Sequence, residues 1–207
     1  MKDPRRAYHA VDEFEAELAD YCDSPYAIAV NSCTNAITLS LSYEGALHDY
    51  LDVTLPTRTY VGVLQAALNT GYMVRWDPNP WVDWYRLWPT RVIDSARCLK
   101  PDSYRTGTFT CLSFHVAKQL PLGRGGAILT DDLEAAEWFR AARMDGRPPS
   151  QPIEATVFPA WHCPMPPDVA ARGLDVLSRW NDRGYQPPPM GIEDYPDLSQ
   201  LLRVRAL

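Results

Sequence analysis

The segment FTCLSFHVAKQLPLGRGGAILTDD, residues 109–132, is the part of the sequence that decides the fold. It opens on an apolar run typical of a buried strand, and a glycine-rich turn at 123–126 leads into a second apolar run, AILT. Asp131 and Asp132 follow where a carboxylate caps a helix, here the helix predicted through LEAAEWFRAARM. Short apolar strands that alternate with helices in this way are the pattern of an α/β fold.

The same alternation extends toward the N-terminus. Val11, Phe14, Leu18 and Tyr21 have helical spacing, so they predict an amphipathic helix that ends near residue 24. The chain then alternates predicted strands at 26–30, 51–55, 72–76 and 90–94 with predicted helices at 34–43 and 60–69. We therefore expect a three-layer α/β/α fold with a mostly parallel sheet, helices on both faces, and functional residues at the carboxyl ends of strands.

The composition changes after about residue 147. Prolines cluster at 148–149, 164–167 and 187–189, and one helical stretch runs from Asp168 to Trp180. We predict one domain, residues 1–183, followed by a short Pro-rich C-terminal tail, residues 184–207. The tail is too short to form a second domain.

Composition narrows the classes of function. The formal net charge of −6 disfavours nucleic acid as a partner and gives no electrostatic reason to expect membrane binding. The N-terminal segment mixes charged and apolar residues, unlike a signal peptide, and no stretch is long and apolar enough to span a bilayer. The five cysteines form no CxxC pair and the four histidines lack ligand spacing, so we expect a reduced, cytoplasmic protein without a metal site.

Three predicted strand ends supply chemically useful groups. Asn31 to Thr34 follow YAIAV, Asp94 ends TRVID, and Ser113 and Lys118 lie around FTCLSFHVAK. Hydroxyl groups and unpaired backbone amides at the start of a helix favour the binding of a phosphate, and Thr34 and Ser113 are the candidates for this role. An aspartate that ends an apolar strand is costly to bury alone but suits a protonated ring nitrogen.

Lys118 completes this set of groups. A desolvated lysine loses its proton readily enough to form a Schiff base. A phosphate donor, an acidic partner and an amine are the contacts that pyridoxal 5'-phosphate (PLP) requires. The residues thus point to a PLP-dependent enzyme.

The order of these residues resembles the DegT/DnrJ/EryC1/StrS family of sugar aminotransferases over residues 13–183. FEAELADYCDSPYAIAVNSCTNAITLSL is similar to the family's helix, strand and SGT-x-A phosphate turn, here Ser32, Cys33 and Thr34. VTLPTRTYVGVLQAALNTG is similar to the segment whose aromatic residue stacks on the cofactor, here Tyr60.

Three further segments carry the resemblance. VIDSA resembles the ring-nitrogen aspartate motif at Asp94, and SFHVAKQLPLGRGGAILTDD resembles the S-F-x-x-x-K segment at Ser113 and Lys118. AWHCPMPPDVAARGLDVL is similar to the family's G-x-N-x-R-M segment, which places His162 at the position of a cross-subunit phosphate contact.

The resemblance implies a PLP-dependent transferase large domain with the C-terminal small domain missing. It implies an internal aldimine on Lys118, transamination of a small amine or nucleotide-sugar substrate, and a homodimer whose subunits share each site. Cys33 departs from the SGT glycine, Arg97 stands where Gln or His is usual, and His162 replaces the family's Asn.

Several residues have a second interpretation. Lys118 alone is typical of a surface lysine, Asp94 of a helix cap or turn, and Thr34 of a helix cap. Tyr60 suits core packing as well as stacking on the cofactor. Arg97 suits a solvated surface charge, a contact to the phenolate oxygen of the cofactor, or recognition of a substrate carboxylate.

Two alternative functions remain open from the sequence. The first is a PLP-dependent decarboxylase, or other α-carbon chemistry, on a bulky substrate such as a modified nucleobase in DNA. The second is a catalytically degenerate protein that keeps the fold and serves as a binding partner.

Overall fold

The computed structural model describes residues 5–147, 151–152, 154, 158–190 and 195–200. The helices are α1 (Arg5–Cys22), α2 (Cys33–Leu47), α3 (Val61–Asn69), α4 (Leu133–Ala142) and α5 (Pro167–Arg183), followed by a short 3-10 helix (Leu198–Gln200). The strands are β1 (Tyr26–Val30), β2 (Asp52–Pro56), β3 (Met73–Asp77), β4 (Tyr85–Arg86), β5 (Val92–Asp94), β6 (Phe109–Ser113) and β7 (Gly126–Thr130). Each strand and helix predicted from the sequence is present, and β4 is an additional strand.

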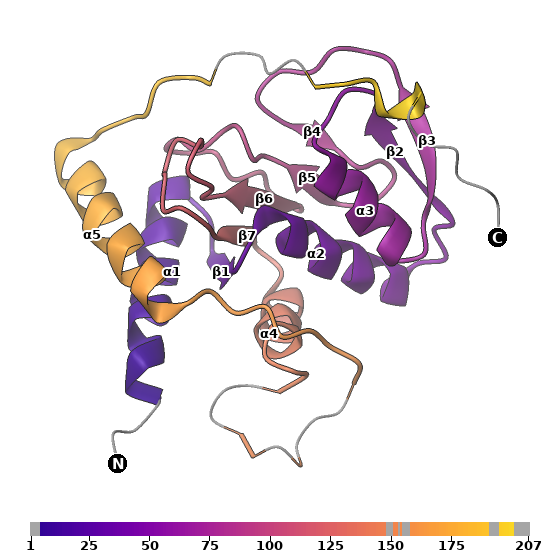
Figure 1. The fold of residues 1–207 in the computed structure, drawn as a ribbon. Helices are drawn as coiled ribbons and strands as arrows, with labels where there is room; N and C mark the ends of the chain where they lie inside the picture. Colours follow the sequence, from indigo (N-terminus) through magenta and orange to yellow (C-terminus); the bar gives the residue numbers. More distant parts are fainter. Residues whose placement is uncertain (1–4, 148–150, 153, 155–157, 191–194, 201–207) are drawn as a thin grey trace.

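A five-stranded sheet in the order β1-β7-β6-β5-β4 forms the middle layer (Figure 1). Strand β7 is antiparallel to both β1 and β6, β5 is parallel to β6, and β4 is antiparallel to β5. The α/β class is confirmed, but the expected mostly parallel pairing is wrong for this sheet. The physical reason is clear for β4 and β5, because their connection, residues 87–91, is too short for the crossover of a dozen or more residues that a parallel pair needs.

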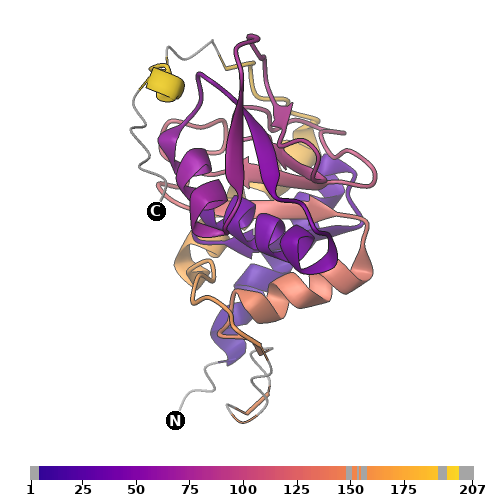
Figure 2. The ribbon, with the colours of Figure 1, turned by 90° about the vertical axis from the view of Figure 1, so that its right-hand side faces the viewer.

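Strands β2 and β3 form a separate parallel pair beside the larger sheet. Figure 2 shows the molecule from the edge at which this pair lies. The backbone N–H of Thr54 in β2 donates to the carbonyl of Trp88, 2.7 Å away, just after β4. The pair therefore continues the middle layer past the end of the five-stranded sheet.

Successive residues of the central strands point to opposite faces. In β1, Ile28 and Val30 pack in a cluster with α2, α3 and α4, whereas Ala27 and Ala29 pack in a second cluster with α1 and α5. Alternation of this kind is the period of a strand. Helices cover both faces of the sheet, so the predicted three-layer α/β/α architecture is confirmed.

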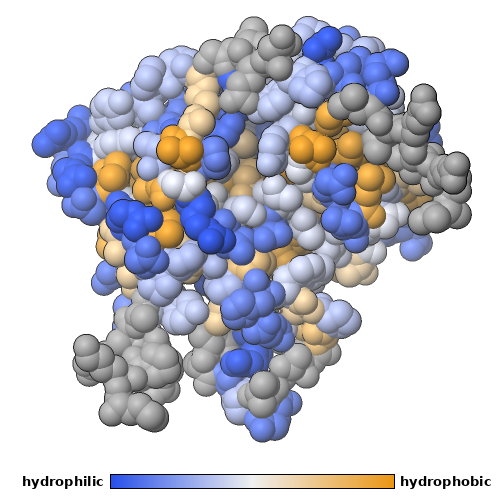
Figure 3. All heavy atoms as spheres, in the orientation of Figure 1, coloured by the Kyte–Doolittle hydropathy of each residue, from blue (hydrophilic) through white to orange (hydrophobic). Residues whose placement is uncertain are grey.

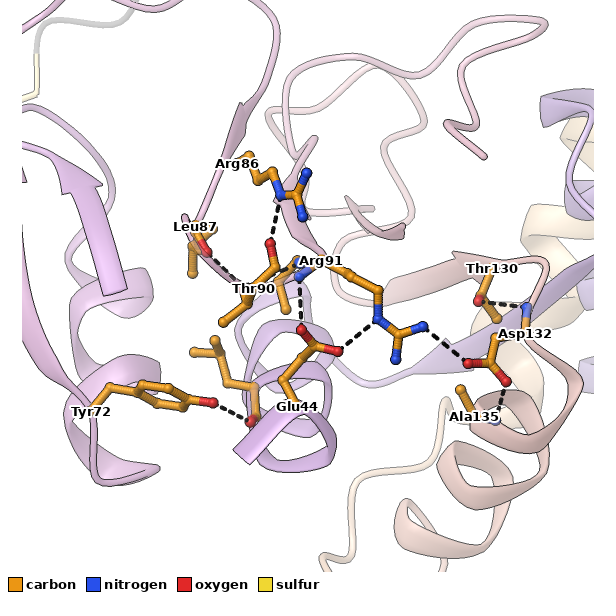
Figure 4. A network of polar contacts seen from close by, with 11 residues as sticks. Glu44, Tyr72, Arg86, Leu87, Thr90, Arg91, Thr130, Asp132 and Ala135 are labelled. Carbon is orange, nitrogen blue, oxygen red and sulfur yellow. Dashed lines mark hydrogen bonds and ion pairs between the residues drawn. The ribbon is translucent and has the colours of Figure 1, made fainter. Parts of the chain in front are cut away.

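Helix α2 is fixed to the sheet by a buried charge network (Figure 4). The fully buried carboxylate of Glu44 accepts hydrogen bonds from the Arg91 side chain at 2.8 Å and from the Arg91 backbone N–H at 2.9 Å. Arg91 also pairs with Asp132 at 3.1 Å, and Asp132 caps α4 by accepting from the N–H of Ala135. The predicted cap at Asp132 is therefore confirmed, and the network joins α2 to α4.

The surface has mixed character. In the view of Figure 3, hydrophilic residues cover most of the face and apolar residues form separate patches. None of the helices in the described parts of the chain is both long and apolar enough to traverse a bilayer.

Candidate active site

Three strands that run in one direction bring the predicted groups together. Because β7 is antiparallel to β1 and β6, and β5 is parallel to β6, the carboxyl ends of β1, β5 and β6 lie at the same edge of the sheet. A cavity of about 330 Å³ is lined by residues from all three ends. Seven of the predicted site residues line it: Ser32, Cys33, Thr34, Tyr60, Asp94, Ser113 and Lys118.

The start of α2 forms one wall of this cavity. Ser32 is the residue that caps the helix, because its hydroxyl accepts from the N–H of Asn35 at 3.1 Å. The capping role considered for Thr34 therefore belongs to Ser32. Since the first N–H groups of a helix have no intrahelical acceptor, this wall presents donors and the positive end of the helix dipole to the cavity. Cys33 keeps its backbone N–H here, so the change from glycine does not remove a donor.

A glycine permits the close approach of β7 to this turn. A Cβ placed on Gly126, the first residue of β7, would lie 2.5 Å from the backbone nitrogen of Cys33. That distance is shorter than any ordinary contact. The glycine-rich turn predicted from the sequence thus has a local reason: β7 and the start of α2 touch through their backbones.

Asp94 lies at the end of β5 with only 5% of its surface exposed. One carboxylate oxygen accepts from the N–H of Ala96 at 2.9 Å, and the other accepts from the hydroxyl of Tyr85 at 2.8 Å. Burial raises the pKa of Asp94, and the two hydrogen bonds and the charges of Lys118 and Arg97 partly offset that rise. The site therefore holds a buried carboxyl group that also lines the cavity.

Sequence reasoning missed Tyr85 and Thr59. Tyr85 is directly opposite Asp94 in the β4–β5 pair, and its hydroxyl oxygen lies 2.6 Å from that of Thr59. Burial, followed by the charge of Asp94, raises the pKa of Tyr85 well above its ordinary value. The stretch YRLWPTRVID contains the available signal, since two short apolar runs flank a proline turn as in a hairpin.

Lys118 lies in the loop after β6, half-buried, and its backbone N–H donates to the carbonyl of His115 at 2.9 Å. Its charge lowers the pKa of both Asp94 and Cys33, whereas burial and the charge of Asp94 raise the pKa of the Cys33 thiol. The amine is therefore an electrostatic neighbour of the buried carboxyl group. This arrangement favours the functional interpretation of Lys118 over a surface lysine.

Tyr60 lies at the mouth of the cavity. It precedes α3, and 56% of its surface is exposed, so core packing does not account for it. Gly62 permits this placement, because a Cβ there would lie 2.6 Å from the Tyr60 ring and 2.7 Å from the Thr34 hydroxyl oxygen. An exposed ring beside a cavity suits a flat ligand that stacks on it.

Two predicted residues are not brought into this cavity. Arg97 is 5% exposed and lines a second cavity of about 520 Å³ with Arg58 and Trp81, so the solvated interpretation is wrong. His162 is exposed, and its Nδ1 atom lies 2.9 Å from a carboxylate oxygen of Asp145. Contacts of Arg97 and His162 with a cofactor stay predictions.

Other residues that line the first cavity are not among the predicted cofactor-binding residues. They are Asn31, Ile37, Val63, Ala96, His115, Ala117, Arg124 and Gly125. The side chains of His115 and Arg124 are exposed, so they lie at the rim. Arg124 belongs to the LGRGG turn, and the sequence signal for it is a positive charge near the predicted phosphate-binding residues.

A three-layer fold with an amine, a buried carboxyl group and a helix start around one cavity defines the class: the large domain of PLP-dependent transferases. The sequence profile of the "DegT/DnrJ/EryC1/StrS aminotransferase family" matches residues 4–80 and 104–179, so the chain belongs to this family. The resemblance drawn from the motifs is thereby confirmed. Residues 81–103, which include Tyr85, Asp94 and Arg97, lie between the two matched stretches.

Individual relatives agree with this assignment. The "Spore coat polysaccharide biosynthesis protein SpsC" of Bacillus subtilis (strain 168) is 26% identical, over 66% of this chain and 46% of the relative. Solved structures with the same fold include the putative sugar aminotransferase Spr1654 from Streptococcus pneumoniae (TM-score 0.65, 19% identity, 84% of this chain and 59% of that one). Another is 3-amino-5-hydroxybenzoic acid synthase (TM-score 0.69, 19% identity, 84% and 56%). The chain spans about half the length of these relatives.

Proposed function

We propose that this chain supplies the cofactor site of a PLP-dependent sugar aminotransferase, with Lys118 as the residue that holds PLP covalently. The observation that carries the proposal is the single cavity in which Lys118, Asp94 and the start of α2 meet. Family membership supports the reaction class. No observation in the described residues favours the decarboxylase or the degenerate binding protein, so neither is proposed.

The residues fit the cofactor. The N–H groups at the start of α2, with the hydroxyl groups of Ser32 and Ser113, would hold the phosphate. Asp94 would face the ring nitrogen and keep a proton on it, and Tyr60 would cover one face of the ring. PLP, when bound, supplies an electron sink for bonds at the carbon that bears the amine. Lys118 would then move the proton at that carbon.

The substrate proposal is a nucleotide sugar. The relatives named above include a polysaccharide biosynthesis protein and a putative sugar aminotransferase. Ala96 lines the first cavity and its neighbour Arg97 lines the second, so a substrate has room beyond the reacting centre. Arginine side chains in the second cavity suit the anionic part of such a molecule.

We also propose a homodimer in a cytoplasmic setting. Tyr60, which lines the first cavity, is 56% exposed, and its neighbour Val61 (47%) and Val116 (65%) are also exposed, so these apolar side chains suit a subunit contact. All five cysteines are free thiols in the described parts of the chain, which supports the reducing compartment.

The test uses the small number of lysines. The sequence has three, Lys2, Lys100 and Lys118, and Lys100 is exposed and outside the cavity. After incubation with PLP and reduction with borohydride, peptide mass spectrometry should find the added mass on Lys118. Lys118→Ala should remove the visible absorption band, and Lys100→Ala should keep it. A label on Lys100, or none, contradicts the proposal.

A further inference from the structure

A short chain of hydrogen bonds stands behind Asp94. The carboxyl group of Asp94 lines the 330 Å³ cavity, whereas Tyr85 and Thr59, which contact it in turn, are not among the residues that line it. Both are buried, with 7% and 1% of their surfaces exposed. These two side chains therefore act on a bound molecule through Asp94 and not by direct contact.

The direction of these hydrogen bonds is fixed by the number of protons. The hydroxyl of Tyr85 has one hydrogen, which it donates to the carboxylate of Asp94 at 2.8 Å. The hydroxyl of Thr59, 2.6 Å from the Tyr85 oxygen, must then donate its own hydrogen to Tyr85. The chain of hydrogen bonds therefore runs from Thr59 to Tyr85 to Asp94, and it ends at the carboxylate that would face the cofactor.

We propose that Tyr85 is a positioning residue of the active site, which holds Asp94 as a carboxylate and so keeps the shared proton on the ring nitrogen of the cofactor. The inference rests on the proposed function, because it gives Asp94 a ring nitrogen to face. Tyr85 lies between the two stretches that the family profile matches, so the family match does not supply this role.

The physical reason concerns the relative basicity of two groups. A proton between a carboxylate and a pyridine nitrogen lies on the more basic partner, and burial makes the Asp94 carboxylate more basic by raising its pKa. A hydrogen bond from Tyr85 stabilises the charged carboxylate and lowers that pKa. Thr59 strengthens the effect, because a tyrosine that accepts a hydrogen bond is a better donor.

Other groups around Asp94 affect its titration. The charges of Lys118 and Arg97 lower its pKa, as does the N–H of Ala96. The thiols of Cys33 and Cys111, from α2 and β6, have pKa values that the Asp94 charge raises. All of these groups remain in a variant that changes only Tyr85, so a difference between variant and wild type measures the hydroxyl alone.

The first experiment uses the protein without cofactor. Carbon-13 NMR of aspartate-labelled protein follows the Asp94 carboxyl group, assigned by comparison with Asp94→Asn. Tyr85→Phe should raise the pKa of Asp94 by about 1, the equivalent of one hydrogen bond to a charged group. Thr59→Val should give a smaller rise, and Thr59→Ser should match wild type.

A matched control is available in Tyr72. Its hydroxyl is also buried and donates to a backbone carbonyl, that of Leu41, at 3.1 Å, and Tyr72 is not among the residues that line the cavity. Tyr72→Phe loses a comparable buried hydrogen bond and should leave the Asp94 titration unchanged. An equal effect of Tyr72→Phe and Tyr85→Phe would show a general loss of structure and overturn the inference.

The second experiment adds PLP labelled with nitrogen-15 in the ring. The nitrogen resonance should indicate a protonated ring in wild type and shift toward the unprotonated position in Tyr85→Phe. Failure of wild type to bind PLP overturns the proposed function and, with it, the role of Tyr85 toward the cofactor. Normal PLP binding with an unchanged Asp94 titration and nitrogen resonance in folded Tyr85→Phe overturns the role of Tyr85 alone.

Discussion

Arg91 holds the buried carboxylate of Glu44 from two directions, with its side-chain Nε at 2.8 Å and its own backbone nitrogen at 2.9 Å. Glu44 is on α2 and Arg91 directly precedes β5, so this contact joins the helix that starts at the 32–34 turn to the strand that ends at Asp94. The guanidinium also lies 4.4 Å from the centre of the Phe109 ring. One arginine thus connects the two walls of the candidate site.

The first prediction concerns this contact. Arg91→Met should lower the free energy of unfolding by about 3 kcal/mol, because it leaves the carboxylate of Glu44 buried without its cation. The control is Arg75→Met, which removes the exposed Arg75–Asp52 pair and should change stability little. Chemical denaturation measures both. Similar losses in the two variants would mean that the burial of Glu44 has no special cost.

The second prediction uses the raised pKa of Asp94. A carboxyl group whose pKa is raised on folding stabilises the fold below its ordinary pKa of 3.8, and that contribution is lost as the pH rises through the folded-state value. Without cofactor, Asp94→Asn should therefore be more stable than wild type at neutral pH, and the difference should shrink as the pH falls toward 4. Equal stability at all pH values would contradict a raised pKa.

The same variant should lose function. An amide does not hold a positive ring nitrogen as a carboxylate does, so Asp94→Asn should keep the fold but abolish turnover. Gain of stability with loss of activity is the expected sign of a residue kept for function. Near-normal turnover in Asp94→Asn would exclude the proposed role.

The elements that the sequence predicted best have a strong local signal. β1 is a continuous apolar run, YAIAV, and its predicted bounds equal those observed. By contrast, β4 has only two residues, and its partner is set by the β4–β5 hairpin and not by hydrophobic spacing. The direction of β7 was also not predictable from its apolar pattern, because that pattern is the same for parallel and antiparallel buried strands.

The residues of the candidate site also differ in whether the sequence carries a local signal for them. Lys118, Asp94 and the 32–34 turn follow strands that the pattern reveals, so they were predicted together. Tyr85 and Thr59 enter through strand pairing and a side-chain contact between distant parts of the chain, and neither leaves a periodic signal. The burial of Arg97 likewise depends on packing around the second cavity.

The third prediction concerns Gly126. Gly126→Ala places a Cβ against the nitrogen of Cys33, so the 32–34 turn, which is proposed to hold the phosphate, must move. We expect the variant to lose about 1–3 kcal/mol of stability. It should also bind PLP more weakly than the wild-type protein does, whereas its binding of pyridoxal, which lacks the phosphate, should change little. Gly123→Ala is the control, because a Cβ there meets nothing within 4 Å while its φ of +88° strains the alanine, so it should cost stability without a selective loss of PLP binding. Equal weakening of PLP and pyridoxal would place the defect away from the phosphate.

The fourth prediction concerns Tyr60. Because its ring is largely exposed in the protein without cofactor, Tyr60→Ala should change stability little. It should weaken PLP binding by about tenfold, the equivalent of one aromatic stacking contact, and Tyr60→Phe should bind as wild type does. Fluorescence titration with PLP measures the affinities. Unchanged affinity in Tyr60→Ala would return the residue to a structural role.

The last prediction concerns His162 and the dimer. The segment around it is anchored: the N–H of Cys163 donates to the carbonyl of Arg143, its carbonyl accepts from the N–H of Asn31 beside the cavity, and Met165 is fully buried. The side chain of His162 nevertheless points to the exposed surface, where it pairs with Asp145. Exposure is a condition for the predicted contact of His162 with the cofactor site of a partner subunit.

The sharpest test of that arrangement combines two variants. In a dimer of one Lys118→Ala chain and one His162→Ala chain, sites shared between subunits give one site with both defects and one with none, because each site takes Lys118 from one chain and His162 from the other. Mixed dimers should therefore bind one PLP covalently with wild-type affinity, whereas His162→Ala alone should bind PLP more weakly at both sites. Asp145→Asn keeps the imidazole and serves as the control. If the protein is a monomer by mass in solution and binds PLP with full affinity, or if mixed dimers show only weak sites, His162 does not complete a neighbouring site.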